Sequence, residues 1–158
     1  MPPYINILDK ERLDELLAPL EPGTLPLWGK LKAQNMIEHL IEAVEFTNGK
    51  KMARLEISTR EAYKEKQEKV RDDFEIPKGV TGPLADNSNK IRFKDLATAI
   101  SRLKEEIETF EDYFKTPGQT SIHGAFGPMN YREWILWHGK HFAHHFRQFG
   151  LLNDYDFS

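Results

Sequence analysis

NYREWILWHGKHFAHHFRQFG, residues 130–150, carries the signals of a complete amphipathic helix. Asn130 followed by Glu133 is a capping box, which marks a helix start, and Gly150 is a typical helix stop. Four of the chain's six histidines fall within eight positions of this stretch, residues 138–145. Neutral imidazole is the commonest protein ligand for a transition metal, and two imidazoles one helical turn apart can bind a single ion. The stretch therefore predicts both a long helix and a metal site.

Five side chains share one narrow stripe of this helix, counted at about 100° per residue. The stripe borders the apolar side of the helix, so its histidines do not point at bulk water. His141 and His145 are four residues apart and can aim at one point beside the helix. His144 falls on another side, and we expect it at the surface. The members of the stripe are Trp134, His138, His141, His145 and Gln148.

Three further side chains near this pair have roles that the sequence leaves open. His138 could join the metal shell, or it could lie one turn below as a hydrogen-bonding partner that orients a ligand ring. Gln148, at the other end of the stripe, can orient a ligand in the same way. His123, in the loop before the helix, could reach the mouth of the site.

The rest of the chain also follows helical periodicity. Strand-like alternation is confined to residues 52–57, which is too little for a sheet. Start and stop signals predict helices at residues 9–19, 31–48, 58–72, 92–114 and 130–149. Helix 58–72 is highly charged, so we expect a peripheral position. The sequence predicts an all-α domain, a helix bundle that spans residues 1–158 as a single unit.

Residues 73–89 contain prolines, glycines and the run Asp86-Asn-Ser-Asn89, and they predict a long loop. Loops of this length in a compact domain are often functional or mobile. A lid over the site is one interpretation.

The composition bounds the class of protein and the chemistry of a metal site. The 158 residues are 39% hydrophobic and 30% charged with a formal net charge of −3, as in ordinary soluble domains, which disfavours nucleic acid as a partner. The chain has no cysteine, which excludes disulfides, thiolate ligands and a cysteine nucleophile. Neither a signal peptide nor a membrane span is recognisable, so we expect a cytoplasmic protein without membrane contact. Any metal must be held by nitrogen or oxygen.

A third metal ligand has to come from another helix. In the expected helix 31–48, His39 lies at the edge of the apolar arc, between a buried side that includes Ala43 and a polar side that includes Glu42. That edge position suits a ligand that faces a cleft of the bundle. His39 therefore joins His141 and His145 as a candidate metal ligand.

These residues resemble the DinB-like superfamily of metal-binding four-helix bundles, which includes thiol transferases that use bacterial low-molecular-weight thiols. The signature of the superfamily is a histidine on the second helix and His-x-x-x-His on the last helix, usually followed three residues later by glutamine. His39, His141, His145 and Gln148 match it. The segments WGKL (28–31), MIEHL (36–40), FGPMNYREW (126–134) and RQFG (147–150) resemble a DinB-like subfamily of unassigned function.

The resemblance extends from the first helix to Gly150, and helix 58–72 is its least recognisable portion. It implies an up-down-down-up bundle with the metal near one end of the cleft between the second and last helices, and zinc or nickel as the ion. Homodimers are also compatible with the superfamily. The additional histidines, His138 and His144, leave open whether the site uses three or four imidazoles.

Three neutral histidines leave at least one coordination position open, the arrangement typical of catalytic zinc. We therefore expect a metal-dependent enzyme acting on a small molecule, either a hydrolase that activates water or an S-transferase that activates a low-molecular-weight thiol. Glu42 or His138 could act as a general base or orient the nucleophile. The alternative is a non-catalytic bundle that binds a metal or a small ligand. A coordinatively saturated site, filled by His138 or His123, would favour that alternative.

Overall fold

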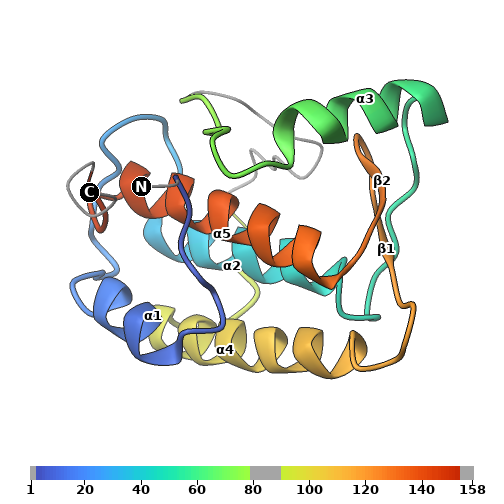
Figure 1. Cartoon of the computed structure of the whole chain (residues 1–158). Helices are drawn as coiled ribbons and strands as arrows, with labels where there is room; N and C mark the ends of the chain where they lie inside the picture. Colours follow the sequence, from blue (N-terminus) through green and yellow to red (C-terminus); the bar gives the residue numbers. More distant parts are fainter. Residues whose placement is uncertain (1–2, 79–89, 154–158) are drawn as a thin grey trace.

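The computed structural model describes residues 3–78 and 90–153. This part of the chain is mostly helical, with five helices and one two-stranded sheet (Figure 1). The helices are α1 (Lys10–Leu17), α2 (Ala33–Glu45), α3 (Thr59–Lys69), α4 (Leu96–Tyr113) and α5 (Tyr131–Gln148). The strands are β1 (Ser121–His123) and β2 (Gly127–Met129). None of the helices in the described ranges is long and apolar enough to cross a membrane.

Side-chain caps set the starts of four helices. Asp9, Ser58 and Asp95 each accept a hydrogen bond from the backbone N–H three residues further on. In α5 the capping box is complete, because Asn130 and Glu133 bond each other's backbone N–H groups at 2.9 and 3.0 Å. All five helices lie inside the ranges expected from the sequence, although each is shorter than expected.

The start of α4 differs from the expectation, and the segment before it bonds to α2. Residues 92–95 were expected to be helical, but α4 begins at Leu96. The carboxylate of the buried Glu38, on α2, accepts hydrogen bonds from the backbone N–H groups of Arg92 at 2.7 Å and Phe93 at 3.2 Å. Glu38 therefore satisfies two backbone N–H groups ahead of the helix, and the side chain of Asp95 caps the first turn by accepting from the N–H of Thr98 at 2.8 Å.

The three long helices α2, α4 and α5 lie side by side, and the short α1 packs beside α4 at one end (Figure 1). Ion pairs join α1 to α4, one from Lys10 to Glu108 at 3.0 Å and one from Lys104 to Asp14. The buried apolar residues of α4 recur at steps of three or four positions and belong to the core: Leu96, Ala99, Leu103, Ile107 and Phe110. One hydrophobic cluster thus includes buried residues of all four helices.

The segment before α1 runs along α5 at very short range. The N–H of Ile5 donates to the carbonyl of Gly139 at 3.2 Å. A Cβ atom on residue 139 would lie 2.2 Å from the carbonyl oxygen of Ile5, so only glycine permits this approach. The glycine in the middle of α5 is explained by this packing.

The expectation of an all-α domain is wrong at residues 121–129, where β1 and β2 form an antiparallel pair. Ser121 pairs with Met129 and His123 with Gly127. Tertiary bonds hold the hairpin in place, because Trp134 Nε1 donates to the Ser121 carbonyl at 3.0 Å and Ser121 Oγ donates to the Phe46 carbonyl at 2.9 Å. Strands of three residues are too short to produce a recognisable alternation.

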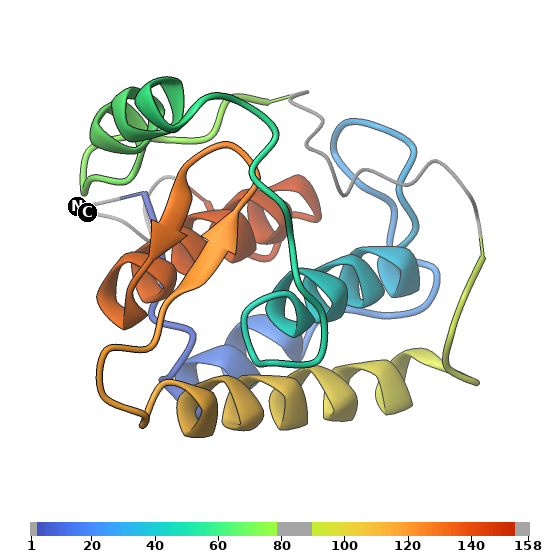
Figure 2. The same cartoon turned by 90° about the vertical axis from the view of Figure 1, so that its right-hand side faces the viewer.

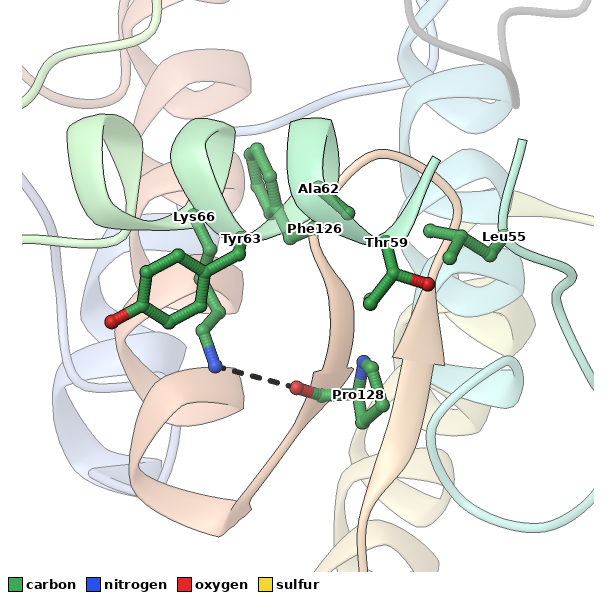
Figure 3. Close-up of a pocket in the computed structure, with 8 residues that line it drawn as sticks. Leu55, Thr59, Ala62, Tyr63, Lys66, Phe126 and Pro128 are labelled. Atoms are coloured by element: carbon green, nitrogen blue, oxygen red, sulfur yellow. Dashed lines mark hydrogen bonds between the residues drawn. The ribbon is translucent and has the colours of Figure 1, made fainter. Parts of the chain in front are cut away.

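Helix α3 is peripheral, as its charge predicted, and it lies above the hairpin in Figure 2, where it contacts β2. Ala62 is its buried residue. Lys66 donates from Nζ to the Pro128 carbonyl at 3.5 Å and pairs with Glu133 at 3.1 Å. A small, open and mostly apolar pocket lies between α3 and the hairpin, with Tyr63 at its rim (Figure 3).

Residues 71–78 lie along the outer side of α5, and residues 79–89 of the expected lid lie outside the described ranges. Lys140 of α5 is fully buried and donates from Nζ to the carbonyls of Phe74 at 2.5 Å and Asp72 at 3.4 Å. Burial lowers the pKa of Lys140. The ring of Phe74 stacks on Trp137, with 6.4 Å between centroids. This buried lysine therefore anchors the segment to the helix.

Candidate metal centre

Two helices that are distant in sequence bring three histidine rings together. His39 lies near the middle of α2, and His141 and His145 lie one turn apart in the carboxyl-terminal half of α5. The Nε2 atom of His141 is 3.0 Å from Nε2 of His39 and 3.2 Å from Nε2 of His145. The three nitrogen atoms all lie within 4.8 Å of one another. They form a group that could hold a metal ion.

The spacing of these nitrogen atoms can be compared with metal geometry. At a zinc–nitrogen distance of about 2.0–2.1 Å, separations of 3.0 and 3.2 Å correspond to ligand–metal–ligand angles of about 95–105°. For these two of the three nitrogen pairs, such angles are close to those of a tetrahedral site. The rings of His39 and His141 are nearly perpendicular, at 85°, so they meet at their nitrogen edges without stacking. The donor set fits a divalent ion.

Burial keeps two of these imidazoles in the form that binds metal. The pKa of His141 lies well below 6.5, mainly because burial disfavours its charged form and then because of His145 and His39. Burial and the nearby His39 lower the pKa of His145 to about 3, although its hydrogen bond to Gln148 opposes the shift. At neutral pH both rings are uncharged, and each can offer a lone pair to a cation.

Gln148 contacts the outer nitrogen of one of these rings. Its Oε1 lies 2.8 Å from Nδ1 of His145, and its Nε2 donates to the backbone carbonyl of Trp28 at 3.1 Å. The sequence pointed to Gln148 as an orienting residue, and the structure places it beside His145. The sequence did not predict that the Trp28 carbonyl accepts from Gln148, because a backbone carbonyl leaves no pattern in the sequence.

His138 lies outside the group of three. Its ring is fully buried, stacks on Trp134 at 5.1 Å and meets Phe110 edge-on at 5.4 Å. Its Nε2 is 2.9 Å from Oγ1 of Thr47, whose hydroxyl donates to the Val44 carbonyl at 2.8 Å. Because that hydroxyl proton is already used, Thr47 accepts the proton of His138 Nε2. Sequence reasoning missed Thr47, which it treated only as part of a helix end.

His144 is not a surface residue, contrary to the expectation from the helical wheel. It is 7% exposed, and its ring meets Trp28 edge-on at 5.9 Å. Burial lowers its pKa, while a hydrogen bond with the backbone of Ile76 opposes the shift. A wheel shows only which side of a helix a residue occupies, and this side is covered by two segments from elsewhere in the chain.

His123 lies on β1, where three aromatic rings surround it. Its ring stacks on Phe126 at 4.1 Å and contacts Trp134 and Trp137 at 5.6 and 5.8 Å. Nδ1 accepts a hydrogen bond from the N–H of Ala125 at 3.0 Å. Burial lowers its pKa to about 4. These contacts fix the orientation of the His123 ring, which the sequence left open. Its Nδ1 atom faces the turn between β1 and β2.

Glu42 lies on α2 one turn beyond His39, and its side chain is 39% exposed. Its carboxylate is 3.6 Å from Nζ of Lys51. The carboxylate is thus placed on the same helix as one candidate ligand and remains accessible to solvent. Its predicted part in catalysis stays a prediction.

Comparison with protein families gives one match. The model of a family described as "Protein of unknown function (DUF1569)" matches residues 78–150, which include α4, the hairpin and α5 with both of its candidate ligands. His39 lies outside the matched residues. Neither the comparison with curated proteins nor the comparison with solved structures gave a match.

Proposed function

We propose that this protein is a metal-dependent enzyme in which His39, His141 and His145 bind a divalent ion through their Nε2 atoms. One observation carries the proposal. Three imidazole nitrogen atoms converge at 3.0 and 3.2 Å, although the chain separates the first ring from the second by 102 residues. Buried imidazoles without a shared ligand more often point to separate hydrogen-bond partners, as His138 and His123 do.

The donor set favours a catalytic site. The group of possible ligands among the described residues contains three imidazoles and no carboxylate. An ion held by neutral donors keeps its full charge, and three protein ligands leave at least one position for a small molecule. We propose zinc or nickel as the ion.

The reaction follows from what occupies the open position. A divalent ion stabilises negative charge on an adjacent atom, which lowers the pKa of water or of a thiol and gives a nucleophile at neutral pH. With water the protein would be a hydrolase, and with a low-molecular-weight thiol it would be an S-transferase. The chain has no cysteine, so the thiol would have to arrive as a substrate.

We assign Glu42 to orient the nucleophile or to accept its proton. Its support is its place one turn from His39 and its accessibility, with Lys51 at 3.6 Å. The catalytic role predicted for His138 has less support, because Thr47 occupies its Nε2 and burial lowers its pKa to about 3. A group with so low a pKa is a weak base at neutral pH. We expect His138 to act by supporting the helix that carries His141.

The DinB-like resemblance supplies the finer part of the proposal. It adds an up-down-down-up four-helix bundle, formed here by α1, α2, α4 and α5, a small-molecule substrate, a cytoplasmic location and possible homodimers. The shared hydrophobic core of these four helices supports the bundle.

Metal analysis of protein purified without chelator or histidine tag tests the proposal. We expect about one zinc or nickel ion per chain in the wild type and almost none in His141→Ala. His123→Ala is a matched control, since it also removes a buried histidine but none of the three nitrogen atoms. Equal substoichiometric metal in wild type and His141→Ala would show that the proposal is wrong. If metal is bound, replacing it with a paramagnetic ion and measuring the relaxation of water protons distinguishes an open site from a saturated, non-catalytic one.

A further inference from the structure

We propose that Gln148 is a positioning residue that couples the metal site to the loop of residues 24–29, with the Trp28 carbonyl as its anchor and Gly29 as the residue that makes room for it. The inference rests on the proposed metal site. It adds that the loop influences how tightly this site binds its metal. The loop also contacts α5 through the Trp28 ring, which meets His144 edge-on at 5.9 Å, so the experiments below are chosen to isolate the connection through Gln148.

The orientation of the Gln148 amide follows from its two partners. A backbone carbonyl can only accept a hydrogen bond, so the group that faces the Trp28 carbonyl at 3.1 Å must be the NH₂. The amide oxygen then necessarily faces Nδ1 of His145, at 2.8 Å. The Trp28 carbonyl thus determines which end of the amide meets the histidine.

The amide oxygen in turn determines the tautomer of His145. Because Oε1 is an acceptor, Nδ1 must carry the proton. A neutral imidazole protonated at Nδ1 has its lone pair on Nε2, and Nε2 is the atom that faces His141 at 3.2 Å. Outer partners of this kind fix the orientation of a ligand ring and raise its basicity.

The loop is held to α5 through the same residue. The N–H of Leu27 donates to the backbone carbonyl of Gln148 at 2.6 Å. The side chains of Leu25 and Leu27 are 81% and 71% exposed, so side-chain packing contributes little to the position of these residues. The backbone and side chain of Gln148 therefore supply two of the bonds that fix the loop.

Gly29 is part of the coupling for two reasons. Its φ of +78° lies in the left-handed region, which favours glycine. A Cβ atom at this position would lie 3.1 Å from Nε2 of Gln148, which is tighter than ordinary contact. Alanine at position 29 would push the amide away from its place, although residue 29 contacts none of the three histidines.

Coupling between two sites is reciprocal. If the loop strengthens metal binding through Gln148, metal binding must stabilise the loop to the same extent. A cation on Nε2 polarises the ring and strengthens the hydrogen bond that Nδ1 donates. We expect zinc to slow hydrogen exchange at the N–H of Leu27.

The test measures zinc affinity by competition with a chromophoric chelator, together with hydrogen exchange at Leu27, at pH 7.5. We expect Gln148→Ala to weaken zinc binding about 10- to 100-fold, as loss of an outer partner typically does. Gln148→Glu keeps an acceptor for His145 but places two acceptors face to face at Trp28. It should therefore bind zinc at least as tightly as wild type while Leu27 exchanges faster, a separation that a merely structural role would not produce.

Gly29→Ala should weaken zinc binding several-fold in the wild-type background and have no further effect in Gln148→Ala, because the two substitutions interrupt one connection. Gly118→Ala is the matched control: its φ is +76° and a Cβ atom there would meet nothing within 4 Å. It should cost stability without changing zinc affinity. Thermal unfolding in chelator identifies a variant that fails to fold. In that case the proposal is decided by Gln148→Glu alone, through its zinc affinity and its hydrogen exchange at Leu27.

The outcomes separate the two proposals. Stoichiometric zinc in wild type, lost in His141→Ala but bound equally by Gln148→Ala and Gly29→Ala, would overturn the coupling alone. Additive losses of zinc affinity in the double variant of Gly29→Ala and Gln148→Ala would overturn the coupling as well. A wild type that binds no zinc would overturn both the coupling and the metal site.

Discussion

The two halves of α5 bury histidines for different purposes. In the amino-terminal half, His138 lies among aromatic rings and donates its Nε2 proton to Thr47, which uses its own proton elsewhere. In the carboxyl-terminal half, Nε2 of His141 and of His145 face each other and His39. Burial lowers the pKa of His138 as it does those of the pair.

The difference lies in which nitrogen carries the proton and what the other one faces. His138 is protonated at Nε2 because Thr47 accepts there, and His145 is protonated at Nδ1 because Gln148 accepts there. Only the second arrangement points a lone pair at the Nε2 atom of another imidazole. A buried histidine with a low pKa is therefore not by itself a sign of a metal site.

The largest contrast is expected in zinc affinity. His145→Ala removes one of three nitrogen donors, so its affinity should fall by more than the 10- to 100-fold typical of outer partners. His138→Ala leaves all three donors, and its affinity should stay within a few-fold of wild type. Chelator competition measures both. Equal losses in the two variants would contradict the division of α5 into two halves.

Stability without metal should show the opposite order. His138→Ala leaves a cavity beside Trp134 and Phe110, and large-to-alanine substitutions in a core cost about 2–5 kcal/mol. His145→Ala should cost less in chelator, because it also relieves the close approach of nitrogen atoms that lack a cation. Urea unfolding of both variants in chelator checks the order, and a larger loss for His145→Ala would refute it.

The hydrogen bond of the amino-terminal half can be broken by itself. Thr47→Val retains the shape of the side chain but leaves the buried Nε2–H of His138 without its acceptor, which should cost about 1–3 kcal/mol. Thr109→Val is the control, since that hydroxyl bonds a backbone carbonyl at an exposed site and should matter by no more than about 0.5 kcal/mol. Zinc affinity should be unchanged in both. Identical unfolding midpoints would argue against the bond.

The last expected effect is on acid stability, and it accumulates gradually with pH. His138 and His123 have pKa values of about 3 and about 4, against 6.5 for an ordinary histidine. Between pH 6.5 and about 4 the unfolded chain binds more protons at these two positions than the folded protein. The free energy of unfolding should therefore fall as pH falls, by about 1.4 kcal/mol per pH unit for each histidine. Unfolding in chelator at pH 7, 6 and 5 measures the slope.

His138→Phe sharpens this measurement, because it keeps an aromatic ring in the cluster and removes one titrating group. Its slope should be lower than that of wild type by about one proton. An unchanged slope would mean that His138 is as easily protonated in the folded protein as in the unfolded chain.

Much of the helical structure was predictable because its signals are local. The capping residues Asp9, Ser58 and Asn130 mark helix starts in the sequence and cap helices in the structure. The spacing of His141 and His145 follows from 3.6 residues per turn, and the structure brings their Nε2 atoms to 3.2 Å. Periodicity, caps and spacing all act within one or two turns of helix.

The rest depends on contacts between distant segments. The sequence proposed His39 as the third ligand, but only the packing of α2 against α5 brings its Nε2 to 3.0 Å from that of His141. The position of the hairpin and the burial of His144 also depend on partners far along the chain.

The sequence by itself determined five helices and a pair of histidines with metal-binding spacing. The tertiary structure decided which histidine nitrogen atoms meet, that His138 bonds to Thr47, and that Gln148 connects His145 to the Trp28 carbonyl. The reason is physical. A helix satisfies its backbone within a few residues, whereas the direction of a lone pair depends on whichever donor or acceptor the fold places opposite it.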